Sequence, residues 1–163
     1  MDALLRHPDQ MASLLAHLDD AAYVSTAIDE VLRWATPVLQ FRRTATVDTE
    51  VRGQEIAAGD KVLIWHISAN RDEEVFPDPF RFDVERTPNE HVAFGGGGAH
   101  FCLGANLAKI EIEIIMREIL SRMPDITADG DTEMLRSNFI GGVKRLPVRF
   151  SPGQRKHPVG TSV

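Results

Sequence analysis

The sequence predicts a mainly α-helical protein that also contains small antiparallel β-sheets, an α+β fold class. Two segments, 25–35 and 102–123, place apolar residues at the three- and four-residue spacing of a helix. Between residues 38 and 67 the apolar period falls to two, which is typical of strands. Residues 70–99 follow with no period and with several prolines and glycines, so we expect one long irregular segment there.

The N-terminal part of the chain is expected to form two helices. Leucines and a methionine at near-helical spacing predict a short helix from about residue 9 to 18. A second helix is predicted over 25–35, with Thr26 and Asp29 as a capping box. Pro37 ends it, because the residue before a proline avoids the helical conformation. One face of this helix is apolar and carries Ile28, Val31, Leu32 and Ala35.

Short β-rich runs separated by turn residues predict a small antiparallel sheet after this helix. Gly53 and the Ala-Gly-Asp sequence at 58–60 supply turn residues. The expected strands are 44–47, 50–52, 54–57 and 61–67.

The last long helix is predicted to run from about Cys102 to Met123, where Pro124 closes it. Its apolar residues cover an unusually broad surface, which indicates burial on several sides. We assign its core face to Leu107, Ile110, Ile114 and Ile115, and this face is widened by Ile112, Met116, Ile119 and Leu120.

A hairpin is expected near the C-terminus, with strands 137–140 and 143–150 on either side of Gly141 and Gly142. Residues 1–150 are expected to form one domain. The polar tail 151–163 is expected to be disordered.

Composition and charge exclude several classes of protein. The 163 residues are 43% hydrophobic and 26% charged, which is ordinary usage for one soluble domain. The net charge of −6 has the wrong sign for a protein that binds nucleic acid. No apolar run is long enough to cross a bilayer, so we expect a cytoplasmic protein without a membrane anchor. The single cysteine, Cys102, excludes an intrachain disulfide.

The segment Phe94–Gly104 concentrates the residues that carry chemistry. Its four consecutive glycines allow a large flat ligand to approach the backbone closely. Cys102 follows at the start of a helix, where free N–H groups favour an anion and therefore a thiolate. A thiolate in that position acts as a nucleophile or as a metal ligand.

Other interpretations of this segment are less well supported. A phosphate-binding loop requires Gly-Lys-Ser or Gly-Lys-Thr after the glycines, and this chain has neither. A flexible linker would not be framed by Phe94 and a long apolar helix. A lone cysteine is most often a small buried hydrophobic residue, and a cysteine protease needs an oriented Cys–His pair.

The segment resembles the haem-binding loop of cytochrome P450s, in which a Phe, a Gly, a His and then Cys-x-Gly hold the haem. Gly98, His100, Cys102 and Gly104 match that pattern residue by residue. Phe94 stands eight residues before the cysteine, and Gly95 occupies the usual phenylalanine position. This arrangement is similar to that of a bacterial subgroup that hydroxylates sterols and methyl-branched lipids.

The resemblance extends to a Glu-x-x-Arg helix and implies a buried ion pair between Glu30 and Arg33. Either Arg81 or Arg86 would complete the triad. Glu133 and Arg136 repeat the spacing, and we interpret this second copy as a surface pair.

The resemblance also assigns groups around the cofactor and the substrate. Arg43 would pair with a haem propionate, next to His100, and a shifted strand register would exchange Arg43 for Arg42. His91 is expected to make a structural hydrogen bond. The substrate pocket would be lined by the apolar residues Val38, Leu39, Phe139 and Ile140.

The function implied by the resemblance is monooxygenation by a haem b whose iron is ligated by the Cys102 thiolate. One oxygen atom of O₂ would enter a C–H bond of a hydrophobic, sterol- or lipid-like substrate. A ferredoxin-type protein would supply electrons near Lys109 and Arg117. The chain is expected to be the C-terminal, haem-ligating part of a P450. It has no acid–alcohol pair for oxygen activation, so alone it is not expected to catalyse turnover.

Two alternatives remain open at this stage. The chain is a non-catalytic haem-thiolate sensor or inactive fragment, or it is a cofactor-free interaction domain whose cysteine is structural.

Overall fold

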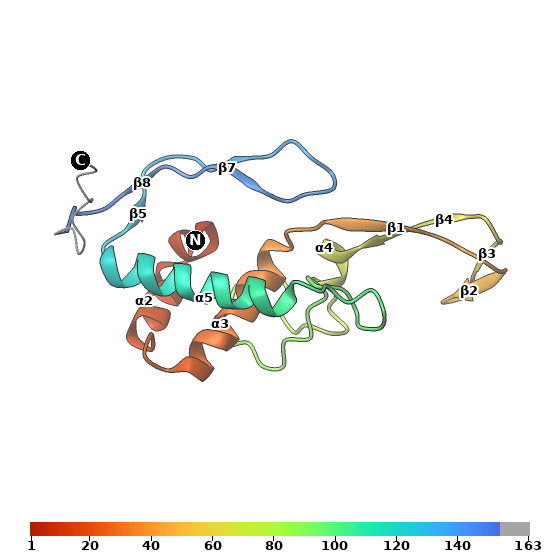
Figure 1. Ribbon diagram of the computed structural model, residues 1–163, viewed down its shortest axis with the longest axis horizontal. Helices are drawn as coiled ribbons and strands as arrows, with labels where there is room; N and C mark the ends of the chain where they lie inside the picture. Colours follow the sequence, from red (N-terminus) through yellow and green to blue (C-terminus); the bar gives the residue numbers. More distant parts are fainter. Residues whose placement is uncertain (154–163) are drawn as a thin grey trace, which may run out of the picture.

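Residues 1–153, which the computed structural model describes, form a group of helices from which β-ladders extend (Figure 1). This arrangement confirms the predicted α+β class. The tail beyond residue 153 lies outside the described residues. The helices are α1 (Asp2–Arg6), α2 (Pro8–Ala16), α3 (Ala21–Ala35), α4 (His66–Ala69) and α5 (Ala105–Arg122).

The start of α3 differs from the prediction. The capping box at Thr26 and Asp29 is wrong, because the helix begins four residues earlier, at Ala21. The Asp20 carboxylate accepts hydrogen bonds from the backbone N–H groups of Ala22 (2.9 Å) and Tyr23 (3.1 Å). Asp20 therefore satisfies the free donors of the first turn. Thr26 lies inside the helix and donates to the carbonyl of Ala22 (3.2 Å).

The sheet region consists of two antiparallel ladders that extend away from the helices (Figure 1). The strand predicted at 44–47 is wrong, because β1 ends at residue 44 and the chain then turns, held by a hydrogen bond from Ala45 N–H to the Asp60 carbonyl (3.0 Å). The other predicted runs contain strands. The first ladder pairs β1 (Gln40–Thr44) with β4 (Lys61–Trp65), and the second pairs β2 (Thr49–Val51) with β3 (Gln54–Ile56).

The C-terminal hairpin is also paired differently from the prediction. Strand β6 (Glu133–Met134) pairs with β7 (Val143–Arg145), and β5 (Thr127–Ala128) pairs with β8 (Val148–Arg149). Residues 137–140 are not the partner of 143–150, because a hydrogen bond from Leu135 N–H to the Gly142 carbonyl (2.8 Å) already closes the β6–β7 ladder. They instead cross to the segment between α3 and β1.

The main core lies between α1, α2, α3 and one side of α5. It includes Leu14, Ile28, Phe82 and Leu120, which are all at least 98% buried. The assignment of the core face of α5 is wrong. Met116 and Leu120 pack inward, with Ile112 and Ile119 beside them, whereas four apolar residues are 55–62% exposed: Leu107, Ile110, Ile114 and Ile115.

Substitution of Asp20 by alanine should lower the free energy of unfolding by about 1 kcal/mol, because two N–H groups of α3 lose their acceptor. Urea denaturation followed by circular dichroism measures this change. The control is Asp19→Ala, which removes the neighbouring carboxylate but not the cap. Equal effects of the two substitutions would contradict the role of Asp20.

Candidate functional site

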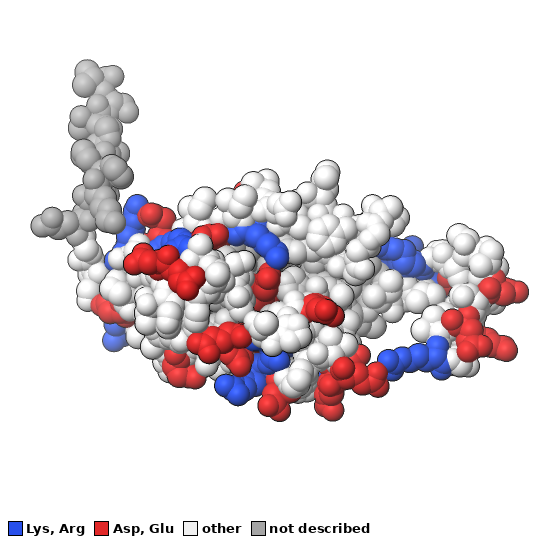
Figure 2. All heavy atoms as spheres, turned by 90° about the horizontal axis from the view of Figure 1, so that it is seen from below, with Lys and Arg blue, Asp and Glu red and all other residues white. Residues whose placement is uncertain are grey.

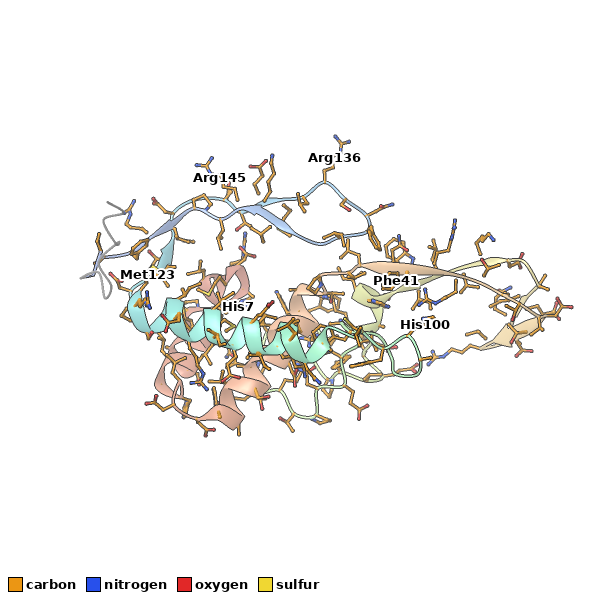
Figure 3. The ribbon with its side chains drawn as sticks, in the orientation of Figure 1. His7, Phe41, His100, Met123, Arg136 and Arg145 are labelled. Carbon is orange, nitrogen blue, oxygen red and sulfur yellow. The ribbon has the colours of Figure 1, made fainter. Side chains whose placement is uncertain are left out.

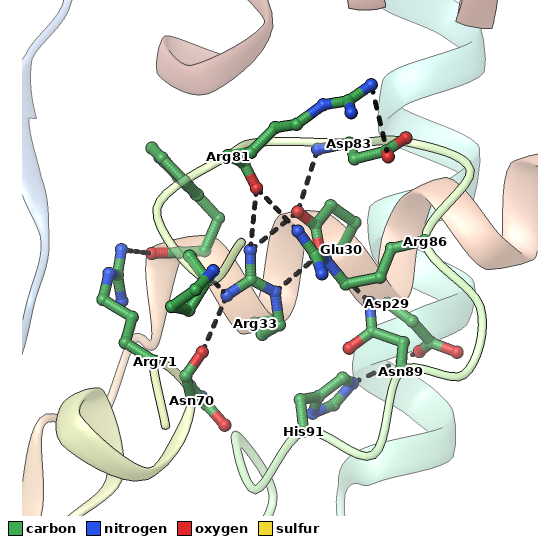
Figure 4. A network of polar contacts seen from close by, with 12 residues as sticks. Asp29, Glu30, Arg33, Asn70, Arg71, Arg81, Asp83, Arg86, Asn89 and His91 are labelled. Carbon is green, nitrogen blue, oxygen red and sulfur yellow. Dashed lines mark hydrogen bonds and ion pairs between the residues drawn. The ribbon is translucent and has the colours of Figure 1, made fainter. Parts of the chain in front are cut away.

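A buried ion pair on α3 contacts the irregular segment that precedes the glycine loop (Figure 4). Arg33 donates from Nε to Glu30 Oε2 (2.7 Å) and from Nη2 to Glu30 Oε1 (2.8 Å). Both side chains are fully buried. The pair is therefore bidentate and charge-assisted, the strong form of this interaction.

The remaining donors of Arg33 bind backbone carbonyls of the irregular segment. Nη1 donates to Asn70 O (2.7 Å) and to Pro79 O (2.9 Å), and Nη2 also donates to Arg81 O (3.2 Å). One guanidinium thus holds three points of a segment that has no helix or strand of its own. Removal of water from this charge is tolerated because its donors are satisfied.

Arg86 is the arginine whose side chain contacts the buried pair. Its Nε donates to Glu30 Oε2 (3.2 Å), and the side chain of Asn89 donates to the same oxygen (3.1 Å). Arg81 contributes only its carbonyl, and its exposed guanidinium lies 3.7 Å from Asp83. The residues of the second Glu-x-x-Arg spacing are exposed, and Glu133 pairs with Lys144.

Asn70 is a linking residue that the sequence did not reveal. Its buried side chain donates to Thr36 Oγ1 (2.9 Å) at the end of α3 and accepts from Val92 N–H (2.8 Å). Val92 lies two residues before Phe94, where the glycine loop begins. The only signal in the sequence was the position of Asn70 at the start of the irregular segment.

A second polar link joins α3, the irregular segment and α5. Asp29 accepts from His91 Nε2 (3.4 Å) and lies 2.6 Å from Lys109 Nζ. His91 Nδ1 accepts from Ala93 N–H (3.2 Å), so the proton resides on Nε2. Burial raises the pKa of Asp29, but the hydrogen bonds from His91 and Lys109 outweigh it, and the net pKa lies below its ordinary value.

The glycine loop closes on itself directly before α5. Cys102 N–H donates to the Phe94 carbonyl (3.0 Å), and Gly95 N–H donates to the Val92 carbonyl (2.9 Å). Gly95, Gly97 and Gly98 have φ values of 94°, 89° and 77°, a backbone conformation that residues with a Cβ rarely adopt. Phe94 packs against the main core and holds the base of the loop.

The loop presents the Cys102 thiol at the surface. Cys102 is exposed, and α5 begins three residues later at Ala105, with Gly104 as a cap that offers no side-chain acceptor. Around it, Phe101 is 50% exposed and Leu103 fully exposed. Within residues 1–153 no three His, Cys, Asp or Glu side chains cluster as metal ligands, so the sulfur is a single soft donor in an apolar setting.

Arg42 and Arg43 lie on opposite faces of the β1–β4 ladder. The Arg43 guanidinium carbon lies 5.4 Å from the centre of the Phe41 ring, so the two side chains share a face. Figure 3 shows Phe41 beneath β1 and His100 on the loop below it. His100 is exposed. The structure thus puts Arg43, rather than Arg42, on the face of the ladder that bears Phe41.

The four residues expected in the substrate pocket come together although they lie about 100 positions apart. Val38 and Ile140 form an antiparallel bridge, and Leu39 N–H donates to the Phe139 carbonyl (2.9 Å). A Cβ at Gly141 would lie 2.9 Å from Leu39 Cδ2, so a larger residue at this position would require the Leu39 side chain to move.

A surface thiol on a glycine loop that follows a buried Glu–Arg–Arg cluster is the arrangement that the resemblance to cytochrome P450s leads us to expect. A family model described as cytochrome P450 matches residues 7–141. The chain belongs to the cytochrome P450 family. The expectation drawn from the glycine loop and the Glu-x-x-Arg helix is therefore confirmed.

Individual relatives agree with this assignment. A methyl-branched lipid omega-hydroxylase of Mycobacterium tuberculosis (strain H37Rv) is 52% identical over 91% of this chain and 34% of its own length. A steroid C26-monooxygenase of Rhodococcus jostii is 45% identical over 98% of this chain and 33% of its own length. The chain thus spans about one third of the curated relatives that it matches.

Solved structures show the same fold. Mycobacterium marinum cytochrome P450 CYP268A2, in complex with pseudoionone, has a TM-score of 0.86 and 48% identity, covering 91% of this chain and 35% of that one. Among the described residues, none of the helices has the length and apolar character needed to span a membrane. Acidic and basic side chains are interspersed over the face shown in Figure 2.

Membership of the family implies a haem cofactor, and the residues present fit one. The site offers one exposed sulfur, a loop whose glycines leave open space beside the backbone, and arginines on the neighbouring ladder. A Cβ placed at Gly96, Gly97 or Gly98 would meet no atom within 4 Å. This set suits a flat, iron-containing ligand with carboxylate groups.

Replacement of Glu30 by alanine should lower the free energy of unfolding by roughly 3–5 kcal/mol, because Arg33 remains buried without its counter-charge. It should also abolish stable haem incorporation. Urea denaturation and haem absorbance after reconstitution measure the two effects. The matched control is Glu133→Ala, in the exposed second copy, which should change stability by less than about 1 kcal/mol. Normal haem occupancy in the Glu30 variant would count against the buried triad.

Substitution of Asp29 by asparagine should reduce stability in a pH-dependent way. The pKa of Asp29 is lower in the folded chain, so its contribution is present above the ordinary value of about 3.9 and disappears as the pH falls through the folded pKa. We expect a loss of about 1 kcal/mol at pH 7, discounted for partial exposure, that shrinks below pH 4. Urea denaturation between pH 7 and 3 measures it, with Asp131→Asn as the control. A difference that is constant across this range would refute the assignment.

Proposed function

We propose that this chain is the haem-ligating part of a monooxygenase and that the Cys102 thiolate ligates the iron of haem b. The observation that carries the proposal is the exposed Cys102 on a closed glycine loop, directly before the first turn of α5. Residues 1–150 would act together as one haem-binding domain.

The residues around Cys102 have separate tasks in this proposal. Gly95 and its neighbours bring the backbone close to the flat cofactor, and Phe94 fixes the base of the loop. Arg43 and His100 bind the propionates as cationic or hydrogen-bonding partners. The chemistry that a haem with a thiolate ligand supplies is the cleavage of the O–O bond of O₂. One oxygen atom of O₂ would enter a C–H bond of the substrate as a hydroxyl group, and the other would leave as water formed with two protons and with two electrons from the redox partner.

The substrate in this proposal is hydrophobic and sterol- or lipid-like. Two observations support it. The apolar residues Val38, Leu39, Phe139 and Ile140 lie on two segments that pair with each other, and two relatives are named a methyl-branched lipid omega-hydroxylase and a steroid C26-monooxygenase. Electrons would come from a ferredoxin-type protein. Lys109 and Arg117, assigned to this docking surface, already contact Asp29 and Glu113, so their effect on a partner would be partly neutralised.

The ligand is tested by substitution of Cys102 in protein reconstituted with haem. The reduced, CO-treated chain should show the long-wavelength Soret band that thiolate ligation causes. Cys102→Ser should abolish this band, whereas His100→Ala should retain it, because in this proposal His100 would bind a propionate and not the iron. A band that survives in the serine variant, or a spectrum typical of imidazole ligation, would overturn the proposal.

A further inference from the structure

A groove on the β1–β4 ladder combines positive charge with apolar surface. It has a volume of about 530 Å³ and is lined by Gln40, Arg42, Lys61, Leu63, Asn138 and Phe139. These residues come from three segments: β1, β4 and the crossing segment 137–140. The groove lies on the Arg42 face of the ladder, opposite the face that carries Phe41 and Arg43.

The register of the ladder explains why these side chains meet. Arg42 is paired with Leu63, and Thr44 is paired with Lys61, so all four residues project from the same face. Lys61 Nζ donates to Thr44 Oγ1 (3.1 Å), which leaves other N–H donors of the ammonium group available. Two cations are therefore fixed on neighbouring strands beside an apolar side chain.

Neither cation of the groove has an acidic partner within residues 1–153. The ion pairs formed there engage other residues, although the chain as a whole carries six more acidic than basic side chains. The Arg42 guanidinium makes no hydrogen bond within residues 1–153. The Arg42 carbonyl accepts one from the Arg43 guanidinium (3.1 Å). The groove thus has the charge that complements a carboxylate.

The apolar part of the groove shares Phe139 with the expected substrate pocket. Leu63 is 49% exposed and Phe139 is 44% exposed, and both line the groove. The Phe139 carbonyl accepts a hydrogen bond from the backbone N–H of Leu39. The centre of the Phe139 ring lies 5.8 Å from the centre of the Phe41 ring, which belongs to the other face of the ladder. Phe139 therefore borders both the cationic groove and the apolar surface formed with Val38, Leu39 and Ile140.

We propose that this groove binds the carboxylate of a long-chain acid, with Arg42 and Lys61 on the acid group and with Leu63 and Phe139 along the chain. The planar guanidinium of Arg42 matches a carboxylate with two parallel hydrogen bonds. The proposal rests on the proposed function and narrows its substrate class to lipids that carry an acid group.

The test compares hexadecanoate with hexadecanol, which has the same chain but no charge. Equilibrium dialysis against the haem-loaded chain, at concentrations where the acid forms no micelles and the alcohol stays dissolved, should give a Kd about tenfold lower for the acid. Arg42→Gln should reduce this preference to about twofold or less, and Arg42→Lys, which keeps the charge, should retain part of it. Lys61→Gln should weaken acid binding about threefold.

The control for the charge change is Arg145→Gln, since Arg145 lies on β7, outside the groove, in Figure 3. It should leave both dissociation constants unchanged. Equal binding of acid and alcohol by the unsubstituted chain, or an equal loss in the Arg145 variant, would overturn the proposal. Circular dichroism verifies that each variant is folded.

The CO spectrum separates this proposal from the proposed function. A thiolate band without acid preference would reject the groove and leave the haem-ligating role intact. Acid preference without the band would reject haem-thiolate ligation and show that the groove recognises carboxylates independently.

Discussion

The bidentate pair of Glu30 and Arg33 is the interaction on which the rest of the structure depends. Two opposite charges are removed from water completely, and such burial is costly unless every hydrogen-bonding group is satisfied. Here the carboxylate also accepts from Asp83 N–H (2.9 Å), and the guanidinium binds three carbonyls. The cost of burial is thus offset only when the irregular segment adopts this one path. The pair specifies geometry more than it adds stability.

That geometry is transmitted to the thiol by two short polar connections. The Asn70 carbonyl accepts a hydrogen bond from Arg33, and the Asn70 side chain accepts one from the backbone N–H of Val92. His91 is held by Asp29, which lies on α3 like Arg33. The glycine loop starts within three residues of these anchors. Cys102, which has no side-chain partner of its own within the described residues, is therefore positioned by a charge cluster that it does not touch.

The sequence predicted local structure better than long-range contacts. Periodicity located α3, α5 and most strands, because one buried face imposes that spacing. The predicted start of α3 was wrong because Asp20 can cap a helix as well as a Thr–Asp pair can. The predicted pairing of residues 137–140 was wrong because an alternating pattern indicates a strand but not the strand with which it pairs. Asn70 and Asp29 could not be identified, because their roles arise from residues up to 80 positions away. The motif chemistry around Cys102 needed no such contacts.

The outer face of α5 has a consequence for the behaviour of this chain in solution. An exposed apolar stripe runs along this 18-residue helix and consists of Leu107, Ile110, Ile114 and Ile115. Contiguous surface of this kind adheres to other nonpolar matter. The isolated polypeptide should therefore self-associate as its concentration rises and should adsorb to phenyl-substituted chromatography resins. Mild detergents, rather than added salt, should keep it monomeric in solution.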